Sequence, residues 1–493
     1  MYENQINSSR DTKIFLSKRT LLIFVIIFII HLWFITFGTW NLFALTPYGD
    51  NMNLWNGVCY DSLAKSLLHG KSTVGPSTIL WEAFIAKGNT SMYFGPFPAF
   101  IRVVLNLAFP FMYGKWSRIS CLVASAFCLL AFLQILRIQL SQNQYLIMKD
   151  KLFLLDLSLL SFGLGTPLLV LMTHSFVYHE AIIWGLCWCL WGLYFTISFL
   201  FLDEKKYLKI LGLSFCAGFA LLSRVSFGVP CYLTLLILTF KPLTEYLFNP
   251  KNRLNNLSAK IPLLLLPALL ALCSQLWYNY DRFGSITDFL PIKYHLNYAV
   301  LKAPENVIDP KRIAICLINF FGFRKEYFSN KPPFIVIPHS YWPNLKNFFT
   351  GYGTQSISYL VISPWLVLGS ILGLFLLFTS KKMLLAKLCG ICYLSNWYIV
   401  CSFPSIVQRY ANEFLPFMIF MYAYFLLTAG RQAFYKNYRI EFKLITIIIC
   451  SISITTTLLS VLGLTLDSIY PEEIKNQAKF IFNFIENIII LIR

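Results

Sequence analysis

Three carboxylates in one long segment could act as a general base. They are Asp50, Asp61 and Glu82. A carboxylate held beside an acceptor hydroxyl can take its proton during group transfer, provided that it lies at the reacting centre. Asp61 begins a stretch with leucines at helical spacing, so it is expected near the start of a short amphipathic helix, where a carboxylate also has a purely structural role. Asp61 is therefore a candidate for the general base and also for a structural carboxylate at the start of a helix.

A second set of residues is cationic and stands at the ends of apolar runs. It comprises Arg224, Arg282, Arg324, Lys325 and Arg409. Snorkelling anchors account for one or two such residues. Several that converge on one face would instead suit a phosphate or pyrophosphate, because guanidinium groups bind its oxygens in pairs and stabilise it as a leaving group. We predict that Arg282, Arg324, Lys325 and Arg409 bind phosphate.

Further polar residues are predicted to line the same cavity: Tyr93, Arg102, His174, His179, Glu180 and Arg224. His179 and Glu180 are adjacent in the chain, so they cannot share one face of a helix as metal ligands do. The sequence therefore predicts no metal site here and no certain cofactor, although assistance by a divalent cation stays open. The 13 cysteines lie mostly inside apolar runs and are interpreted as small buried hydrophobic residues.

The elements that must position these residues are membrane helices. Of the 493 residues, 57% are hydrophobic and only 13% are charged, which excludes a water-soluble protein. Apolar runs of about 20 residues recur along the chain, and each must be helical to cross a membrane. The net charge of +19 would suggest nucleic acid in a soluble protein, but in a membrane protein it chiefly sets topology, so no nucleic-acid partner is expected.

We predict an all-α polytopic membrane protein with about 11–12 transmembrane helices. Residues 1–20 form a cytoplasmic segment, and residues 21–466 form the transmembrane domain. The predicted spans lie near 21–43, 117–138, 152–173, 178–202, 207–223, 225–241, 261–280, 358–379, 384–402, 411–430 and 444–466. Along this path the connections on one side are rich in Lys and Arg and those on the other side are not, which is typical of a cytoplasmic and an outer side.

Two long segments then fall on the outer side, at 46–116 and 281–357. The first contains the apolar stretch from Phe97 to Met112, which is broken by prolines and is predicted to form interfacial helices. Residues 467–493 are predicted to form either an amphipathic interfacial helix or a last membrane helix.

With these features the chain resembles the GT-C class of membrane glycosyltransferases, in particular the branch of bacterial protein-mannosyl and lipid A aminoarabinose transferases. The resemblance covers about 420 residues. It is carried by the order and placement of five features: Leu67-Leu68-His69-Gly70, Gly95-Pro96-Phe97-Pro98, Arg118, Asn279-Tyr280-Asp281-Arg282-Phe283-Gly284 and Arg409-Tyr410.

The resemblance implies inverting transfer of a sugar from a polyprenyl-phosphate carrier to a lipid, glycan or protein acceptor. It also implies a bacterial inner membrane with the active site on the periplasmic side. The essential carboxylate of this class lies in the first outer segment, but Trp55 and Asn56 stand where its Asp-Glu pair is usual. Asp61 is therefore the first candidate for the base, Asp50 the second and Glu82 the third.

Two functions from other classes fit the same membrane topology. One is a flippase or transporter of lipid-linked glycans, and the other is a glycan polymerase. Internal repeats and helices broken at the membrane midplane are typical of transporters, whereas here the polar groups gather at one face. The identities of the sugar and the acceptor and the oligomeric state do not follow from the sequence.

Overall fold

The structure is a computed structural model that describes residues 17–44, 58–79, 82–248, 257–289, 291–296, 307–336, 339–340, 354–381, 383–429, 439–466 and 472–492. Asp50, the second candidate for the base, lies outside these residues.

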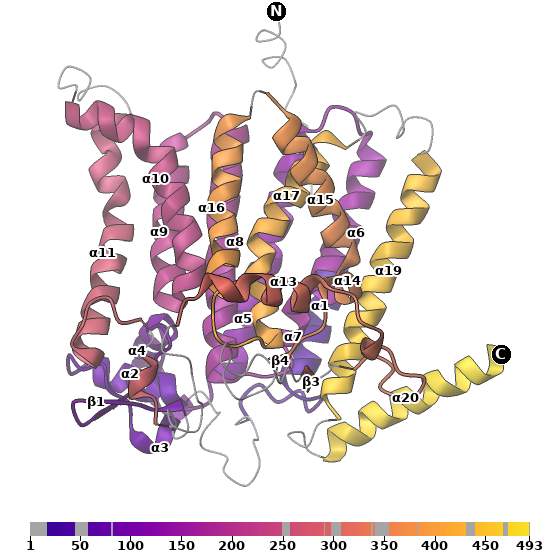
Figure 1. The fold of residues 1–493 in the computed structure, drawn as a ribbon, viewed down its shortest axis with the longest axis horizontal. Helices are drawn as coiled ribbons and strands as arrows, with labels where there is room; N and C mark the ends of the chain where they lie inside the picture. Colours follow the sequence, from indigo (N-terminus) through magenta and orange to yellow (C-terminus); the bar gives the residue numbers. More distant parts are fainter. Residues whose placement is uncertain are drawn as a thin grey trace, which may run out of the picture.

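The described part of the chain is a bundle of long apolar helices (Figure 1). The long helices are α1 (Lys18–Ile35), α5 (Ser117–Gln142), α6 (Met148–Leu164), α8 (Val177–Phe201), α9 (Lys206–Ser223), α10 (Val225–Phe248), α11 (Leu257–Phe283), α15 (Pro364–Thr379), α16 (Leu384–Cys401), α17 (Leu415–Thr428) and α19 (Arg439–Leu464). Among the described residues, nine helical stretches are long and apolar enough to cross a membrane, and apolar helices at Val225–Phe240 and Pro364–Thr379 are shorter. Each predicted span coincides with one of these helices, so the fold class is confirmed.

Close approach of backbones fixes parts of this bundle. The helix α15 packs against α17 along Gly373, where an added Cβ atom would lie 1.8 Å from the carbonyl oxygen of Met421. Small residues at such contacts let two membrane helices approach closely enough for extensive van der Waals packing. The helix α8 is surrounded on several sides, since it packs on α5 and α9. It is accordingly apolar around most of its circumference.

The two long inter-helix segments gather at the end of the bundle opposite the N-terminus (Figure 1). The first contributes α2 (Val58–Leu67), α3 (Pro76–Ile79), the antiparallel strands β1 (Phe84–Ala86) and β2 (Asn89–Ser91), and α4 (Phe97–Ala108). The second contributes α13 (Ile313–Phe321), the strands β3 (His339–Ser340) and β4 (Thr354–Gln355), and α14 (Tyr359–Ile362). Both segments therefore lie on one face, as their predicted path requires.

Two helices bear on the interfacial predictions. The helix α4 has 12 residues, or about 18 Å of helix, which is too short for a hydrocarbon layer of about 30 Å. It packs against α2 and against the ends of α8 and α9. The helix α20 (Glu472–Ile492) runs away from the base of α19 at a large angle (Figure 1). This orientation favours the interfacial alternative for the C-terminal segment.

Candidate active site

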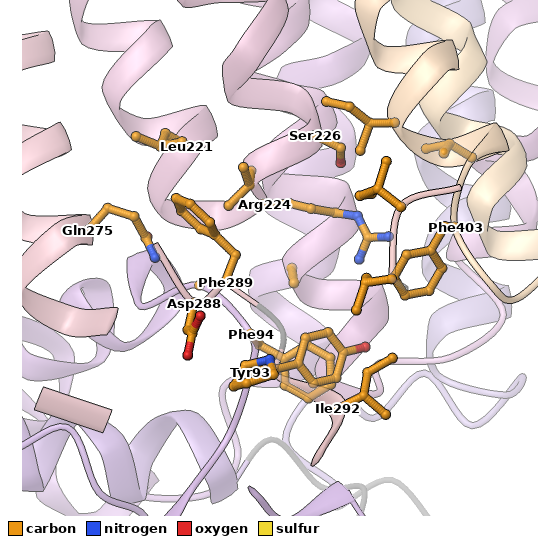
Figure 2. A pocket seen from close by; sticks show the side chains of 18 of the residues that line it. Tyr93, Phe94, Leu221, Arg224, Ser226, Gln275, Asp288, Phe289, Ile292 and Phe403 are labelled. Atoms are coloured by element: carbon orange, nitrogen blue, oxygen red, sulfur yellow. The ribbon is translucent and has the colours of Figure 1, made fainter. Parts of the chain in front are cut away.

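A cavity of about 770 Å³ opens at the end of the bundle where the two long segments meet. Its wall comes from seven parts of the chain: residues 93–95, the N-terminal part of α8, the junction of α9 with α10, α11 with residues 287–289 and 291–293 after it, residues 307–308, the end of α16, and the 3-10 turn at Gln408–Phe414. Most of the lining is apolar, and a few polar side chains enter it (Figure 2). A largely apolar hollow with a few convergent polar groups is the usual form of a ligand site.

Gly95 allows the first segment to close against the bundle. An added Cβ atom would lie 2.1 Å from the carbonyl oxygen of Leu222 and 2.6 Å from that of Ser223, both at the end of α9. Only a residue without a side chain can approach the helix end so closely. The cavity wall formed by residues 93–95 therefore depends on this glycine.

Arg224 is the single residue between α9 and α10, and its side chain projects into the cavity. Its backbone is extended, with φ −160° and ψ 122°, and its side chain is 17% exposed. The Nε atom donates to Oε1 of the buried Glu413, and no other hydrogen bond joins the side chain to a described residue. The two terminal nitrogens of Arg224 are thus available to a ligand.

A second guanidinium group, that of Arg409, lies near the same Tyr410 ring as the first but is not part of the cavity lining. Its Cζ atom is 4.2 Å from the ring centroid of Tyr178 and 5.3 Å from that of Tyr410. The Arg224 guanidinium lies 4.9 Å from the same Tyr410 ring, so the two cations flank one aromatic side chain that lines the cavity. No carboxylate of the described chain forms an ion pair with Arg409, which leaves its charge available to an anion.

The opposite wall carries Asp288. Figure 2 shows Asp288 and Arg224 on different sides of the cavity, with Phe289 between them. The Asp288 side chain makes no hydrogen bond with any residue that the structure describes, and it is the one carboxylate in the described lining of the cavity. Gln275 and Lys293 also line this region. The cavity therefore places a carboxylate across from the Arg224 guanidinium.

Glu82 lies outside the lining but close to it. Its Oε2 atom is 3.8 Å from Nε2 of His295, and its side chain is 30% exposed. Glu82 lies close enough to Tyr93 and Arg409 for its charge to interact electrostatically with both side chains. Glu82 is thus a carboxylate at the edge of the cation pair rather than across from it.

Asp61, the first candidate for the base, is buried away from the cavity. It lies in α2, with Oδ1 accepting a hydrogen bond of 2.6 Å from Asn106 and Oδ2 at 3.7 Å from Nε of Arg102. Arg102 in turn donates to Glu180 at 2.7 Å, and Ser117 donates to the same carboxylate. Asp61, Arg102 and Glu180, which we term the buried triad, are all 0% exposed. They connect α2 and α4 to α8, which is a structural role.

Burial in this triad raises the pKa of Asp61 to about 6, against the opposing influence of Arg102 and Asn106. The native state therefore binds more protons than the unfolded chain between about pH 4 and 6, and stability falls as the pH rises through this window. We expect the unfolding free energy of the wild type, relative to Asp61→Asn, to fall by about 2 kcal/mol between pH 4 and 7. Denaturant titrations in detergent at several pH values measure this difference. A pH-independent difference would contradict the burial of an ionisable group at this position.

The remaining predicted phosphate ligands do not enter the cavity. Arg282 is 2% exposed, and its nitrogens donate to the carbonyl oxygens of Met92 and Tyr278 and to the side chain of Asn279. It therefore joins the end of α11 to the first segment. Arg324 donates to Asn319, and Lys325 is exposed; neither is part of the cavity lining.

The two histidines lie beside the cation pair, outside the cavity lining. The rings of His174 and His179 are 5.5 Å apart, and Nδ1 of His174 is 2.7 Å from Oγ1 of Thr173. Burial lowers the pKa of His174 to about 3. Among the residues that the structure describes, no group of three His, Cys, Asp or Glu side chains could hold a metal ion.

From the predicted set, the structure thus places Arg224 and Tyr93 in the cavity lining and Arg409 near it, and adds Asp288 and Glu413 to them. Asp288 gave no signal in the sequence, because it is a single acid in an irregular segment. Glu413 stands four residues after Arg409. Carboxylates are scarce at membrane depth, so its position in the sequence alone could have indicated a functional role.

No family model matches the sequence, and no curated protein matches it. Among solved structures, the oligosaccharyltransferase of Archaeoglobus fulgidus in its apo form is similar at a TM-score of 0.49 and 13% identity, over 90% of this chain and 55% of that chain. ArnT from Cupriavidus metallidurans, bound to undecaprenyl phosphate, is similar at a TM-score of 0.45 and 13% identity, over 92% of this chain and 77% of that chain.

Both of these neighbours are membrane glycosyltransferases of the GT-C class, the class that the sequence resembles. A further structure, archaeal oligosaccharyltransferase AglB from Archaeoglobus fulgidus in complex with an inhibitory peptide and a dolichol-phosphate, is similar at a TM-score of 0.45 and 13% identity. This chain spans about half the length of the archaeal protein.

Proposed function

We propose that this protein is a glycosyltransferase that moves a sugar from a polyprenyl-phosphate carrier to an acceptor hydroxyl. The observation that carries the proposal is the composition of one cavity at the end of a membrane bundle. The Arg224 guanidinium stands on one side with that of Arg409 near the same Tyr410 ring, the Asp288 carboxylate stands on the other side, and most of the remaining lining is apolar.

The apolar part of the cavity suits the carrier chain. Leu221 and Val225 line it at the junction of α9 with α10, and Val400 and Phe403 line it at the end of α16. An isoprenoid chain can contact such a surface at the cost of little polar desolvation. A donor of this kind stays in the bilayer, so the protein needs no soluble domain for a nucleotide sugar.

The cation pair suits the leaving phosphate. As the bond between the anomeric carbon and the phosphate oxygen breaks, negative charge grows on that oxygen. Guanidinium groups held at this position stabilise the charge in a site of low dielectric constant. Arg224 offers two terminal nitrogens, and Arg409 contributes a charge with no carboxylate partner in the described chain.

The carboxylate across the cavity suits the acceptor. In an inverting displacement the acceptor oxygen attacks the face of the sugar opposite the leaving group, so the base must stand opposite the phosphate ligands. The position of Asp288 on the other side of the cavity from Arg224 supports this role (Figure 2). It takes the proton of the hydroxyl while the new bond to the anomeric carbon forms, and the carrier departs as its phosphate. Glu82 is the second candidate.

We further propose that the cavity faces the outer side of a bacterial inner membrane. The cavity lies where the two long segments meet, at the end of the bundle away from the start of α1, and the basic connections predict a cytoplasmic N-terminus. Cysteines introduced at Lys87 and Lys387 and labelled in intact cells test the orientation. Labelling of Lys387→Cys alone would contradict it.

Loss of either guanidinium should weaken donor binding. We expect Arg224→Ala and Arg409→Ala each to bind polyprenyl phosphate about 10- to 100-fold less tightly, because each removes charge-assisted contacts. Equilibrium binding to the purified protein in nanodiscs measures the effect. Arg137→Ala is the matched control, because Arg137 contacts Gln134 within α5. Unchanged affinity in both cavity variants would contradict the assignment.

Reconstitution with a labelled polyprenyl-phosphate sugar tests the function itself. Covalent transfer of the label to an acceptor in a membrane extract is the expected result. Movement of the labelled lipid across the membrane without a product would identify a flippase, and growth of a long glycan would identify a polymerase.

A further inference from the structure

We infer that Glu413 is a positioning residue that holds the Arg224 guanidinium in the orientation for binding the carrier phosphate. The inference rests on the proposed function, because it concerns the ligand of the same cavity. It assigns a task to a carboxylate that is outside the cavity lining and that would otherwise be only a buried charge.

Both carboxylate oxygens of Glu413 accept a hydrogen bond from a neighbouring side chain. Oε1 accepts from Nε of Arg224, and Oε2 accepts a hydrogen bond of 2.6 Å from the hydroxyl of Ser226. The backbone carbonyl of Glu413 accepts a hydrogen bond of 2.8 Å from Asn396 in α16. Glu413 is 0% exposed. It is therefore a fixed acceptor with no exposed atom that could contact a ligand.

The position of Arg224 explains why it needs such a partner. It is the one residue between α9 and α10, its backbone is extended, and its side chain lines the cavity. A long side chain at a helix junction would sample several rotamers, each with the charge in a different place. Because Glu413 engages Nε, only the two terminal nitrogens are left toward the cavity, which is the arrangement that a pair of phosphate oxygens requires.

The charge balance separates the roles of the two arginines. Glu413 offsets the charge of Arg224, whereas no described carboxylate forms an ion pair with Arg409. Arg409 thus supplies net charge and Arg224 supplies directed hydrogen bonds. Removal of the Glu413 charge would leave the site more cationic and yet less able to bind the phosphate, which is opposite to the effect expected from charge alone.

Glu413→Gln tests the inference, with undecaprenyl phosphate in nanodiscs as the probe. The variant preserves the shape of the side chain and loses its charge. We expect about 10- to 100-fold weaker binding despite the added positive charge, and partial recovery in Glu413→Asp. In the Arg224→Ala background, Glu413→Gln should cause no further loss, because the two residues act as one unit. Additive losses would overturn the positioning role.

Controls separate this role from destabilisation. Asp150→Asn removes a buried carboxylate held by Arg439 and Lys443 at the other end of the bundle, so it should lower thermal stability and leave binding per folded molecule unchanged. Equal binding by the wild type and Glu413→Gln would overturn the inference and leave the proposed function intact. If the wild type itself binds no undecaprenyl phosphate, the proposed function fails, and this inference fails with it.

Discussion

Asp288→Asn should reduce the rate of sugar transfer by about 10²- to 10⁴-fold, which is the usual contribution of a general base. The amide preserves the size of the side chain but cannot take the proton of the acceptor. Because Asp288 lies on the other side of the cavity from Arg224, donor binding should change much less than the rate. Single-turnover assays with a labelled donor, combined with direct donor binding, separate the two quantities.

Glu82→Gln and Asp50→Asn are the matched variants for this assignment. If Glu82→Gln loses the activity and Asp288→Asn retains it, the base is Glu82, and the acceptor approaches from the side of His295. Asp50 lies outside the described residues, so its variant tests the prediction that only the sequence supports. Full activity in all three variants would remove the general base from the mechanism.

Arg102→Ala should destabilise the protein by about 3–5 kcal/mol, because it leaves two buried carboxylates, Asp61 and Glu180, without their shared cation. Both carboxylates are 0% exposed, so water cannot replace the guanidinium without opening the contact of α4 with α8. Unfolding by SDS titration in mixed micelles measures the loss of free energy.

Neutral replacement of the triad is the control for this prediction. The variant Arg102→Met, Asp61→Asn, Glu180→Gln removes all three charges together and should recover most of the stability that Arg102→Ala loses. A loss of less than about 1 kcal/mol in Arg102→Ala would contradict the triad as the connection between α2, α4 and α8, because surface substitutions alone have effects of that size.

The helices of this protein could be predicted from its sequence because the physical cause is local. An apolar run must satisfy its backbone groups within itself when it enters hydrocarbon, and each predicted span coincides with a helix. The sequence also predicted that both long segments lie at the same end of the bundle, because an even number of predicted spans separates them. The position of α4 was also predictable, because prolines break its apolar stretch.

The site could be predicted only in part, because its causes are not local. Asp61 has the sequence pattern of an exposed carboxylate in the first turn of a helix, but Arg102 and Glu180 arrive from α4 and α8 and enclose it. Arg282 has the pattern of a phosphate ligand, but its donors are engaged by the main chain. Asp288 is adjacent to no motif, and its place depends on the path of the chain after α11.

The one-residue junction between α9 and α10 has a consequence for how this sequence can vary. A single inserted or deleted residue there would turn α10 by about 100° about its axis. This rotation would expose the packed face of α10 to lipid and move the Arg224 side chain out of its place in the cavity. Relatives that retain the same chemistry should therefore differ in length within the two extramembrane segments and keep an invariant register between these two helices.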